Sequence, residues 1–143
     1  MRKVARSALV PYTAEQMYAL VEEVDAYPDF LPWCTGVIVH SRNAEEIDAT
    51  LELERGSIRK SFRTRNSLQP GKAMKLELIG GPFKHLEGFW LFEQLGTDGS
   101  KVSLDLEFEF ESRVTDAVFG SFFESTCNSL VNSFTDRARK VYG

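Results

Sequence analysis

Alternating apolar and polar residues occupy the middle of the chain and predict a run of β-strands. A strand is also predicted over residues 86–95; the alternation itself is visible in residues 49–54, 58–68, 74–78 and 102–110. In the last of these segments every second residue from Val102 to Phe110 is apolar, which is typical of a strand with one buried face. Residues 86–95 are apolar on both faces, and residues 2–10 predict a further strand from a weaker pattern. In the strand over 58–68, Ile58, Phe62 and Leu68 share one face.

Two segments change to a helical period. Thr13-Ala14-Glu15-Gln16 matches a capping box and predicts a helix that begins after Thr13 and ends near residue 27. From about residue 115 to residue 142, one apolar stripe repeats at helical spacing and predicts a long amphipathic helix. The stripe consists of Phe119, Phe122, Phe123, Cys127, Leu130, Val131, Phe134, Ala138 and Val141.

The order of these elements predicts an α+β fold. Turn signals separate the strands, for example Gly56-Ser57, Pro70-Gly71 and the run from Gly96 to Gly99, and Gly80-Gly81-Pro82 indicates a bend or bulge. Strands joined by such short turns are antiparallel. We therefore expect one domain, residues 1–143, in which a curved antiparallel sheet packs its apolar face on the long C-terminal helix.

Residues 27–34, Tyr-Pro-Asp-Phe-Leu-Pro-Trp-Cys, form the densest aromatic and proline segment of the chain. Proline disfavours helical backbone in the residue before it, so we expect Tyr27 and Leu31 to be extended or turn-like. The segment predicts a stiff, kinked, apolar connector. Such a connector caps a core or guards the mouth of a cavity.

The chain has eleven phenylalanines in 143 residues, and this aromatic surface needs a partner. Two interpretations are open: the side chains between sheet and helix fill an ordinary core, or they leave an apolar pocket. The candidate walls are Phe62, Leu76, Trp90, Phe108 and Phe110 on the sheet and Phe119, Phe122, Phe123 and Leu130 on the helix. Apolar stripes alone favour the filled core.

Two strings carry a resemblance to a known family. Residues 27–34 and residues 81–90, Gly-Pro-Phe-Lys-His-Leu-Glu-Gly-Phe-Trp, resemble the coenzyme Q-binding START-like family, and the likeness extends over the whole chain. The resemblance implies a helix-grip fold, in which a seven-stranded sheet grips the C-terminal helix around a lipid-sized cavity. It implies that the walls named above surround a ligand, together with Phe30, Leu31, Trp33 and Phe83 from the two strings.

Three functions follow from the resemblance as expectations. The first is non-catalytic binding of ubiquinone or a similar isoprenoid lipid in support of respiration, with residues 27–34 as a lid. The second belongs to a toxin branch of the family and is binding to the large ribosomal subunit, which blocks subunit joining. The third is a polyketide cyclase-like enzyme, and the nearly apolar walls argue against it.

The remaining chemistry-bearing residues suggest no catalytic or metal site. His40 and His85 are far apart, and sequence shows no partner for either beyond Lys84 and Glu87 beside His85. Cys34 and Cys127 lie without metal-ligand or redox spacing, so we expect two buried free thiols and a reducing compartment. We therefore expect no catalytic residue, no metal and no required cofactor.

Charge and hydropathy set the expected location. The net charge of −4 argues against general nucleic-acid binding, although Arg59, Arg63 and Arg65 share one strand face and could contact RNA or anionic lipid. The alternative is that these arginines pair across strands with Glu52, Glu54 or Glu107. Without a secretory pattern or a spanning apolar run, we expect a cytoplasmic protein, with a membrane contact through residues 30–33 as a further expectation.

Overall fold

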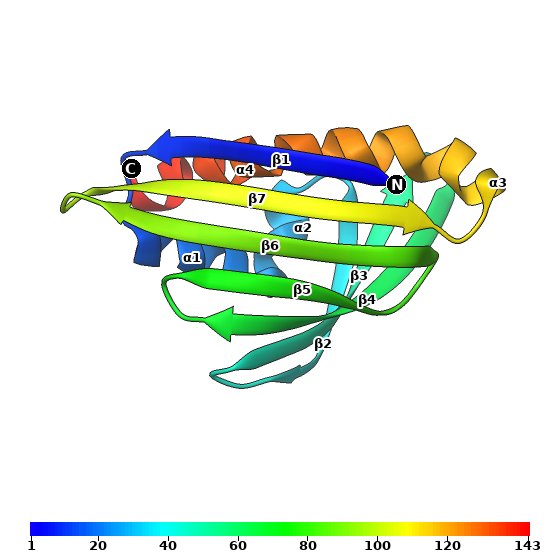
Figure 1. The fold of residues 1–143 in the computed structure, drawn as a ribbon, viewed down its shortest axis with the longest axis horizontal. Helices are drawn as coiled ribbons and strands as arrows, with labels where there is room; N and C mark the ends of the chain where they lie inside the picture. The colour runs from blue at the N-terminus through cyan, green and yellow to red at the C-terminus, as the bar shows by residue number, and fades with distance from the viewer.

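A computed structural model describes residues 1–143 as one sheet of seven antiparallel strands with a long C-terminal helix against it (Figure 1). The predicted α+β helix-grip arrangement is therefore confirmed. The elements are β1 (Arg2–Val10), α1 (Ala14–Glu22), η1 (Val24–Ala26), α2 (Tyr27–Phe30), β2 (Cys34–Arg42), β3 (Glu46–Arg55), β4 (Ile58–Gln69), β5 (Ala73–Gly80), β6 (Phe83–Leu95), β7 (Gly99–Phe110), α3 (Arg113–Thr115), η2 (Asp116–Gly120) and α4 (Ser121–Tyr142).

The sheet order is β1-β7-β6-β5-β4-β3-β2, so consecutive strands from β2 to β7 pair with one another and β1 closes the far edge beside β7. Interruptions in the pairing register bend the sheet, and two of them involve Arg63 on β4 and Phe83 on β6. Both lie beside Gly81, as the predicted bend requires. Gly81 has a φ of 139°, and a Cβ there would lie 2.8 Å from the Phe62 Cβ, so only glycine fits.

The two helices that cover the concave face are positioned by their ends. α1 begins with the predicted capping box: the Gln16 amide donates to the Thr13 hydroxyl at 3.1 Å, and the Thr13 amide donates to Gln16 Oε1 at 2.8 Å. α4 packs against β1 and α1, and Figure 1 shows it running along the sheet beside β1 and β7. Phe134 on α4 and Phe108 on β7 are buried in the resulting core.

The connector after α1 differs from its prediction at one residue. Tyr27 is helical, with φ −53° and ψ −42°, and begins α2, whereas Leu31 is extended as predicted. Pro28 stands in the first turn of α2, where its missing amide proton leaves no helical hydrogen bond unmade. The burial of the Tyr27 side chain outweighs the bias against helix before proline. The Tyr27 hydroxyl also donates to the Val21 carbonyl, which ties the connector to α1.

The C-terminal helical region begins slightly before the predicted residue and has three parts. Ser112 caps α3 by accepting a hydrogen bond from the Thr115 amide at 3.1 Å, and η2 is a π-helical turn that leads into α4. Arg2 on β1 donates to both oxygens of Asp116 at 3.0 and 3.1 Å and reaches Glu124 at 3.3 Å. This ion-pair group fixes the start of the helix to the edge of the sheet.

Candidate functional site: an apolar cavity between sheet and helix

A cavity of about 80 Å³ lies between α4 and the concave face of the sheet. Fifteen residues line it, and thirteen of them are hydrophobic. They come from the connector, from five neighbouring strands β3 to β7 and from α4, so the cavity exists only when the sheet wraps around the helix. Its walls suit an apolar ligand, which gains free energy by leaving water.

Six of the thirteen predicted wall residues line this cavity. They are Trp33, Phe62, Leu76, Trp90, Phe123 and Leu130. Whether any of them binds a ligand stays a prediction. Trp33, Leu76 and Leu130 are only half-buried, so they mark the part of the wall that lies nearest to solvent.

Most of the other predicted wall residues pack against one another and fill the space beside the cavity. Phe83 stacks on Phe110 with ring centroids 4.6 Å apart, and Phe108 meets Phe123 edge-on at 4.9 Å. Phe119 is buried as well. The interpretation as ordinary core therefore describes this aromatic cluster, while the interpretation as a pocket describes the space next to it.

Three predicted residues lie elsewhere. Leu31 is buried in the core, and Phe30 is half-buried against Phe134 at 5.2 Å. Phe122 is half-buried on the outer side of α4, where the guanidinium of Arg55 lies 5.3 Å from its ring centroid. Phe122 thus belongs to the apolar stripe of the helix without lining the cavity.

The volume of the cavity limits what it holds in this conformation. Ligand pockets for molecules of drug size measure roughly 300–1,000 Å³. A space of about 80 Å³ is large enough for a few ordered waters or a small ligand group, but smaller than a lipid. Entry of a lipid therefore requires the half-buried wall residues to move outward.

Two polar residues, Thr64 and Asn66, line the otherwise apolar cavity. Both lie on the inner face of β4 in register with Phe62, and Asn66 is 3% exposed. The Asn66 Oδ1 atom is buried and has no hydrogen-bond partner. Neither residue was predicted from the sequence, although their parity with Phe62 places them on the same face. Ile58 was assigned to that face but is 43% exposed near the strand end, so the inner apolar face of β4 begins at Phe62.

The titratable side chains in the cavity wall are held neutral by burial. Burial raises the pKa of the Tyr27 hydroxyl and of the Cys127 thiol well above their ordinary values. Cys34, outside the cavity, has its pKa raised to about 11 by burial. Both cysteines are buried and free, as predicted, and protonated thiols are poor nucleophiles.

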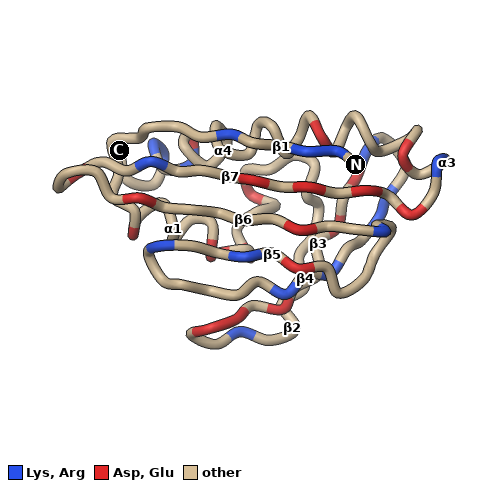
Figure 2. The backbone as a smooth tube through the Cα atoms, in the orientation of Figure 1, with Lys and Arg blue, Asp and Glu red and all other residues tan.

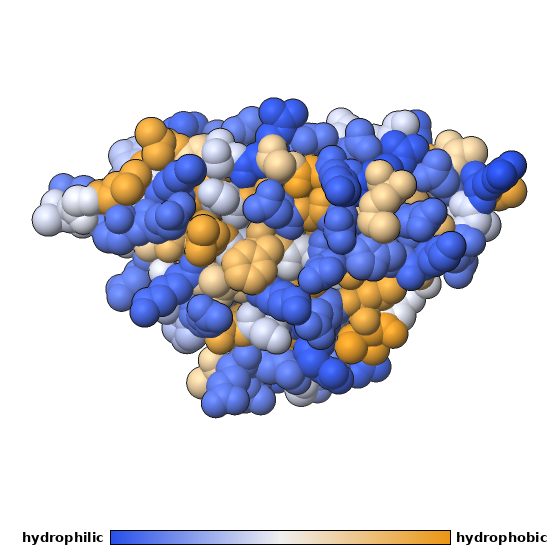
Figure 3. All heavy atoms as spheres, in the orientation of Figure 1, coloured by the Kyte–Doolittle hydropathy of each residue, from blue (hydrophilic) through white to orange (hydrophobic).

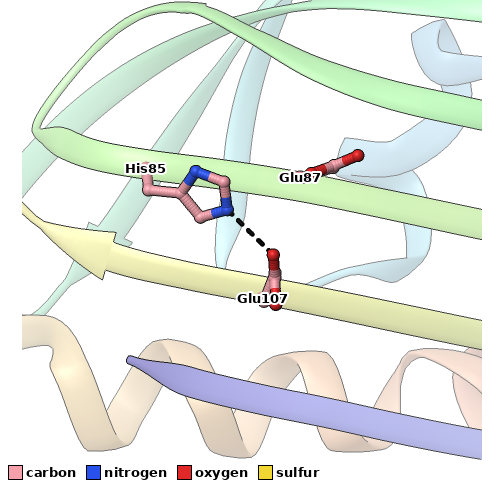
Figure 4. Close-up of side chains that lie close together, drawn as sticks. All are labelled: His85, Glu87 and Glu107. Carbon is pink, nitrogen blue, oxygen red and sulfur yellow. Dashed lines mark hydrogen bonds and ion pairs between the residues drawn. The ribbon is translucent and has the colours of Figure 1, made fainter.

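Both histidines lie away from the cavity, on the outer surface of the sheet. His85 on β6 is hydrogen-bonded to Glu107 on β7, with 3.1 Å between His85 Nε2 and Glu107 Oε1, and Glu87 lies nearby (Figure 4). One ligand atom from each of these three residues lies within 4.8 Å of the others, a grouping that the separate histidines in the sequence did not suggest. His40 contacts the Thr50 hydroxyl at 2.7 Å.

The three candidate surface arginines lie on β4 and pair with carboxylates of β3. Arg63 donates to both oxygens of Asp48 at 2.7 and 2.8 Å. The ion pairs of the other two are Arg59 with Glu54 at 3.6 Å and Glu52 at 3.8 Å, and Arg65 with Glu46 at 3.4 Å. Figure 2 shows positive and negative residues interspersed over these strands. The cross-strand pairing alternative thus describes this face, although Glu107 is not a partner.

The exposed face of the sheet is mostly hydrophilic, with small isolated apolar patches (Figure 3). Phe89 and Leu91 of β6 are among the exposed large hydrophobic residues. No helix of the structure combines the length and the apolar character needed to cross a membrane.

Comparison with known proteins places these features in context. The sequence profile of the family described as "Polyketide cyclase / dehydrase and lipid transport" matches residues 10–135. The chain is 43% identical over 143 residues to the ribosome association toxin RatA of Vibrio cholerae serotype O1. This match covers 100% of this chain and 99% of that protein. It is 26% identical over 136 residues to the mitochondrial coenzyme Q-binding protein COQ10 of Dictyostelium discoideum, over 92% of this chain and 66% of that one.

Solved structures share the fold at lower identity. The Zhui aromatase/cyclase from Streptomyces sp. R1128 superposes with a TM-score of 0.86 at 15% identity, over 99% of this chain and 96% of that one. A likeness at this level of identity concerns the fold, because one fold serves many functions.

Proposed function

Since the chain belongs to the polyketide cyclase / dehydrase and lipid transport family, we propose that it is a non-catalytic protein that binds ubiquinone or a similar isoprenoid lipid in the cavity between α4 and the sheet. The observation that carries the proposal is the cavity itself, whose lining is apolar except for Thr64 and Asn66. A hydrophobic tail with a small polar head matches such a lining.

The chemistry of the lining supports binding rather than catalysis. Its ionisable groups, Tyr27 and Cys127, stay protonated near neutral pH because burial raises the pKa of each. General acid–base catalysis works best with a group whose pKa lies near the operating pH. His85 and Glu107, the histidine–carboxylate pair of the chain, lie on the outer face of the sheet and cannot reach a ligand in the cavity.

Burial of an apolar lipid tail supplies a favourable free energy for uptake. A tail that buries about 200 Å² of apolar surface gains about 5 kcal/mol at about 25 cal/mol per Å². That gain must exceed the free-energy cost of moving the half-buried Trp33, Leu76 and Leu130 outward. The proposal therefore includes an opening motion of this wall, beside the connector, and a transient contact of the connector with a membrane.

Lipid extraction tests the proposal directly. The untagged protein is purified from its own cells, and the lipids that copurify are quantified by mass spectrometry. The test variant is Leu130→Asp, which puts an unpaired charge into the cavity wall, and the matched control is Phe122→Asp on the outer side of the same helix.

We expect near-stoichiometric ubiquinone in the wild-type protein and in Phe122→Asp. Leu130→Asp should fold but lose the bound ubiquinone. A wild-type protein that is empty and also rejects added ubiquinone would refute the proposal.

Association with the ribosome is the second candidate function. It is favoured by the 43% identity, over the full chain, to a relative named a ribosome association toxin. We propose binding to the large subunit through the outer face of β3 and β4. Surface ion pairs are weak, so Arg59 and Arg65 can exchange carboxylate for phosphate partners.

Cosedimentation with purified large subunits at low salt tests this second function. Arg59→Glu with Arg65→Glu should weaken binding, whereas Arg139→Glu with Lys140→Glu, at exposed positions of the far end of α4, serves as a charge-matched control. Absence of binding by the wild-type protein at low salt would exclude the second function.

A further inference from the structure

We propose that Thr64 and Asn66 form a polar subsite that selects neutral lipids carrying a carbonyl or hydroxyl oxygen, with Asn66 as the specificity-determining residue. The inference rests on the proposed lipid-binding function and specifies the chemical class of the ligand head. It assigns a role to an asparagine side chain that the folded protein itself leaves unsatisfied.

Asn66 is an unusual residue for its position. Asparagine is depleted in β-strands, and buried polar atoms in folded proteins nearly always have a partner. Here the side chain is 3% exposed and its Oδ1 atom has none. An apolar side chain of similar size would avoid that cost, so the amide is best explained by a group that enters the cavity from outside the chain.

Neighbouring strands cannot supply the missing partner. Asn66 pairs in register with Ile47 on β3 and with Leu76 on β5, and both side chains are apolar. Thr64 is flanked in the same way by Ala49 and Leu78. The two polar groups are therefore an isolated pair on one strand, about 7 Å apart as alternate residues are.

Beyond this pair, the space that the two side chains face is apolar. Gly88 lies opposite Leu76 on β6 and adds no side chain, and Leu106 follows on β7. The opposite wall is α4, which contributes Phe123, Cys127 and Leu130. A ligand head placed there meets Thr64 and Asn66 as its main polar contacts.

The chemistry of the pair defines the ligand class. An amide carries both a donor and an acceptor, and a hydroxyl does the same. The unpartnered Asn66 Oδ1 can accept from the hydroxyl of a quinol, while the Asn66 amide nitrogen and the Thr64 hydroxyl can donate to the carbonyl oxygen of the corresponding quinone. The lining contains no cation, so a fatty-acid carboxylate would be buried without a countercharge, which is strongly unfavourable.

Intrinsic fluorescence provides the assay, because Trp33 and Trp90, the two tryptophans of the chain, both line the cavity. The quinone probe is decylubiquinone, followed by quenching. The oxygen-free probe is decylbenzene and the anionic probe is dodecanoate, each measured by competition with the quinone. The variants are Asn66→Leu, Thr64→Val and, as a matched control, Asn132→Leu at an exposed position of α4.

We expect Asn66→Leu to weaken decylubiquinone binding about tenfold, which corresponds to about 1.4 kcal/mol, while decylbenzene binds it equally well or better. Thr64→Val should have a smaller effect in the same direction, and Asn132→Leu none. Dodecanoate should compete poorly in every variant. The melting temperature of Asn66→Leu should rise, since the orphaned amide is gone; if that variant fails to fold, Asn66→Ala replaces it.

The outcomes separate this inference from the function on which it rests. Wild-type binding of decylubiquinone with an unchanged affinity in Asn66→Leu would overturn the polar subsite, because the amide would then serve only a buried water. Strong competition by dodecanoate would overturn it as well. A wild-type protein that binds no quinone would overturn the proposed function itself, and the inference with it.

Discussion

Phe134 joins the three parts of the fold that surround the cavity, so its truncation is the most informative test of the packing. The centroid of its ring lies 5.5 Å from that of Tyr27, 5.2 Å from that of Phe30 and 5.5 Å from that of Trp90, and each pair is edge-on. These partners belong to the connector and to β6, while Phe134 itself is on α4 and is buried. Phe134→Ala removes all three contacts and leaves a cavity.

The expected loss of stability follows from this geometry. A buried Phe→Ala change costs about 3–5 kcal/mol, and three edge-on aromatic pairs place this position toward the upper end. A chain of 143 residues has an unfolding entropy of about 0.3 kcal/mol/K. The melting temperature should therefore fall by about 10–17 °C.

Phe122→Ala is the matched control for this experiment. It is the same substitution on the same helix, but the side chain is half-buried and contacts Arg55 on the surface. It should cost about half as much, about 1.5–2 kcal/mol, because only part of the side chain packs against the core. Urea unfolding of both variants, followed by circular dichroism, measures the difference. Equal losses in the two variants, or a loss below about 1.5 kcal/mol for Phe134→Ala, would refute the assignment of inner and outer faces on α4.

Two further predictions concern the cavity and the charged face. A Cβ at Gly88 would lie 2.7 Å from Leu106 Cδ1 and 2.8 Å from Leu76 Cδ1, so the larger side chain of Gly88→Val must displace these two residues of the cavity wall. The displaced side chains should narrow the cavity and reduce copurified lipid while the protein stays folded; wild-type lipid content would contradict this. Hydrogen bonds from Arg63 lower the pKa of Asp48 in the folded protein. The ionised carboxylate therefore stabilises the fold fully above the unfolded pKa of about 3.9, and this stabilisation is lost as pH falls through the lower folded pKa. In urea titrations, Asp48→Asn should therefore lose less unfolding free energy below about pH 4 than the wild-type protein does. The same decrease with pH in both proteins would contradict a lowered pKa of Asp48.

The sequence predicted the architecture because the hydrophobic pattern and the turn residues agree with each other. Strict alternation located β7, glycine-containing turns separated the hairpins, and the capping box located the start of α1. The prediction was wrong for Tyr27, because a local preference before proline is weak compared with the burial of this side chain and its hydrogen bond to Val21. Tertiary contacts decide such positions, and sequence patterns do not contain them.

The site was less predictable than the fold. Helical periodicity identifies a stripe that is wide enough to face several neighbours, so it could not distinguish Leu130, in the cavity wall, from Phe122 on the outside. It also could not show that Phe83, Phe108 and Phe110 would pack on one another, since that depends on the curvature of the sheet. Thr64 and Asn66 interrupt the apolar pattern of β4, so hydrophobic periodicity alone did not assign them to the cavity wall.

The position of the cavity follows from the small residues as much as from the large ones. Along β4 the inner face changes from Phe62 to Thr64, and along α4 Phe123 is followed one turn later by Cys127. Where phenylalanines face one another, the space between sheet and helix is filled, and where these smaller residues face one another it stays open. The chain thus encodes its cavity by a local deficit of side-chain volume, and the buried amide of Asn66 lies in that same deficit.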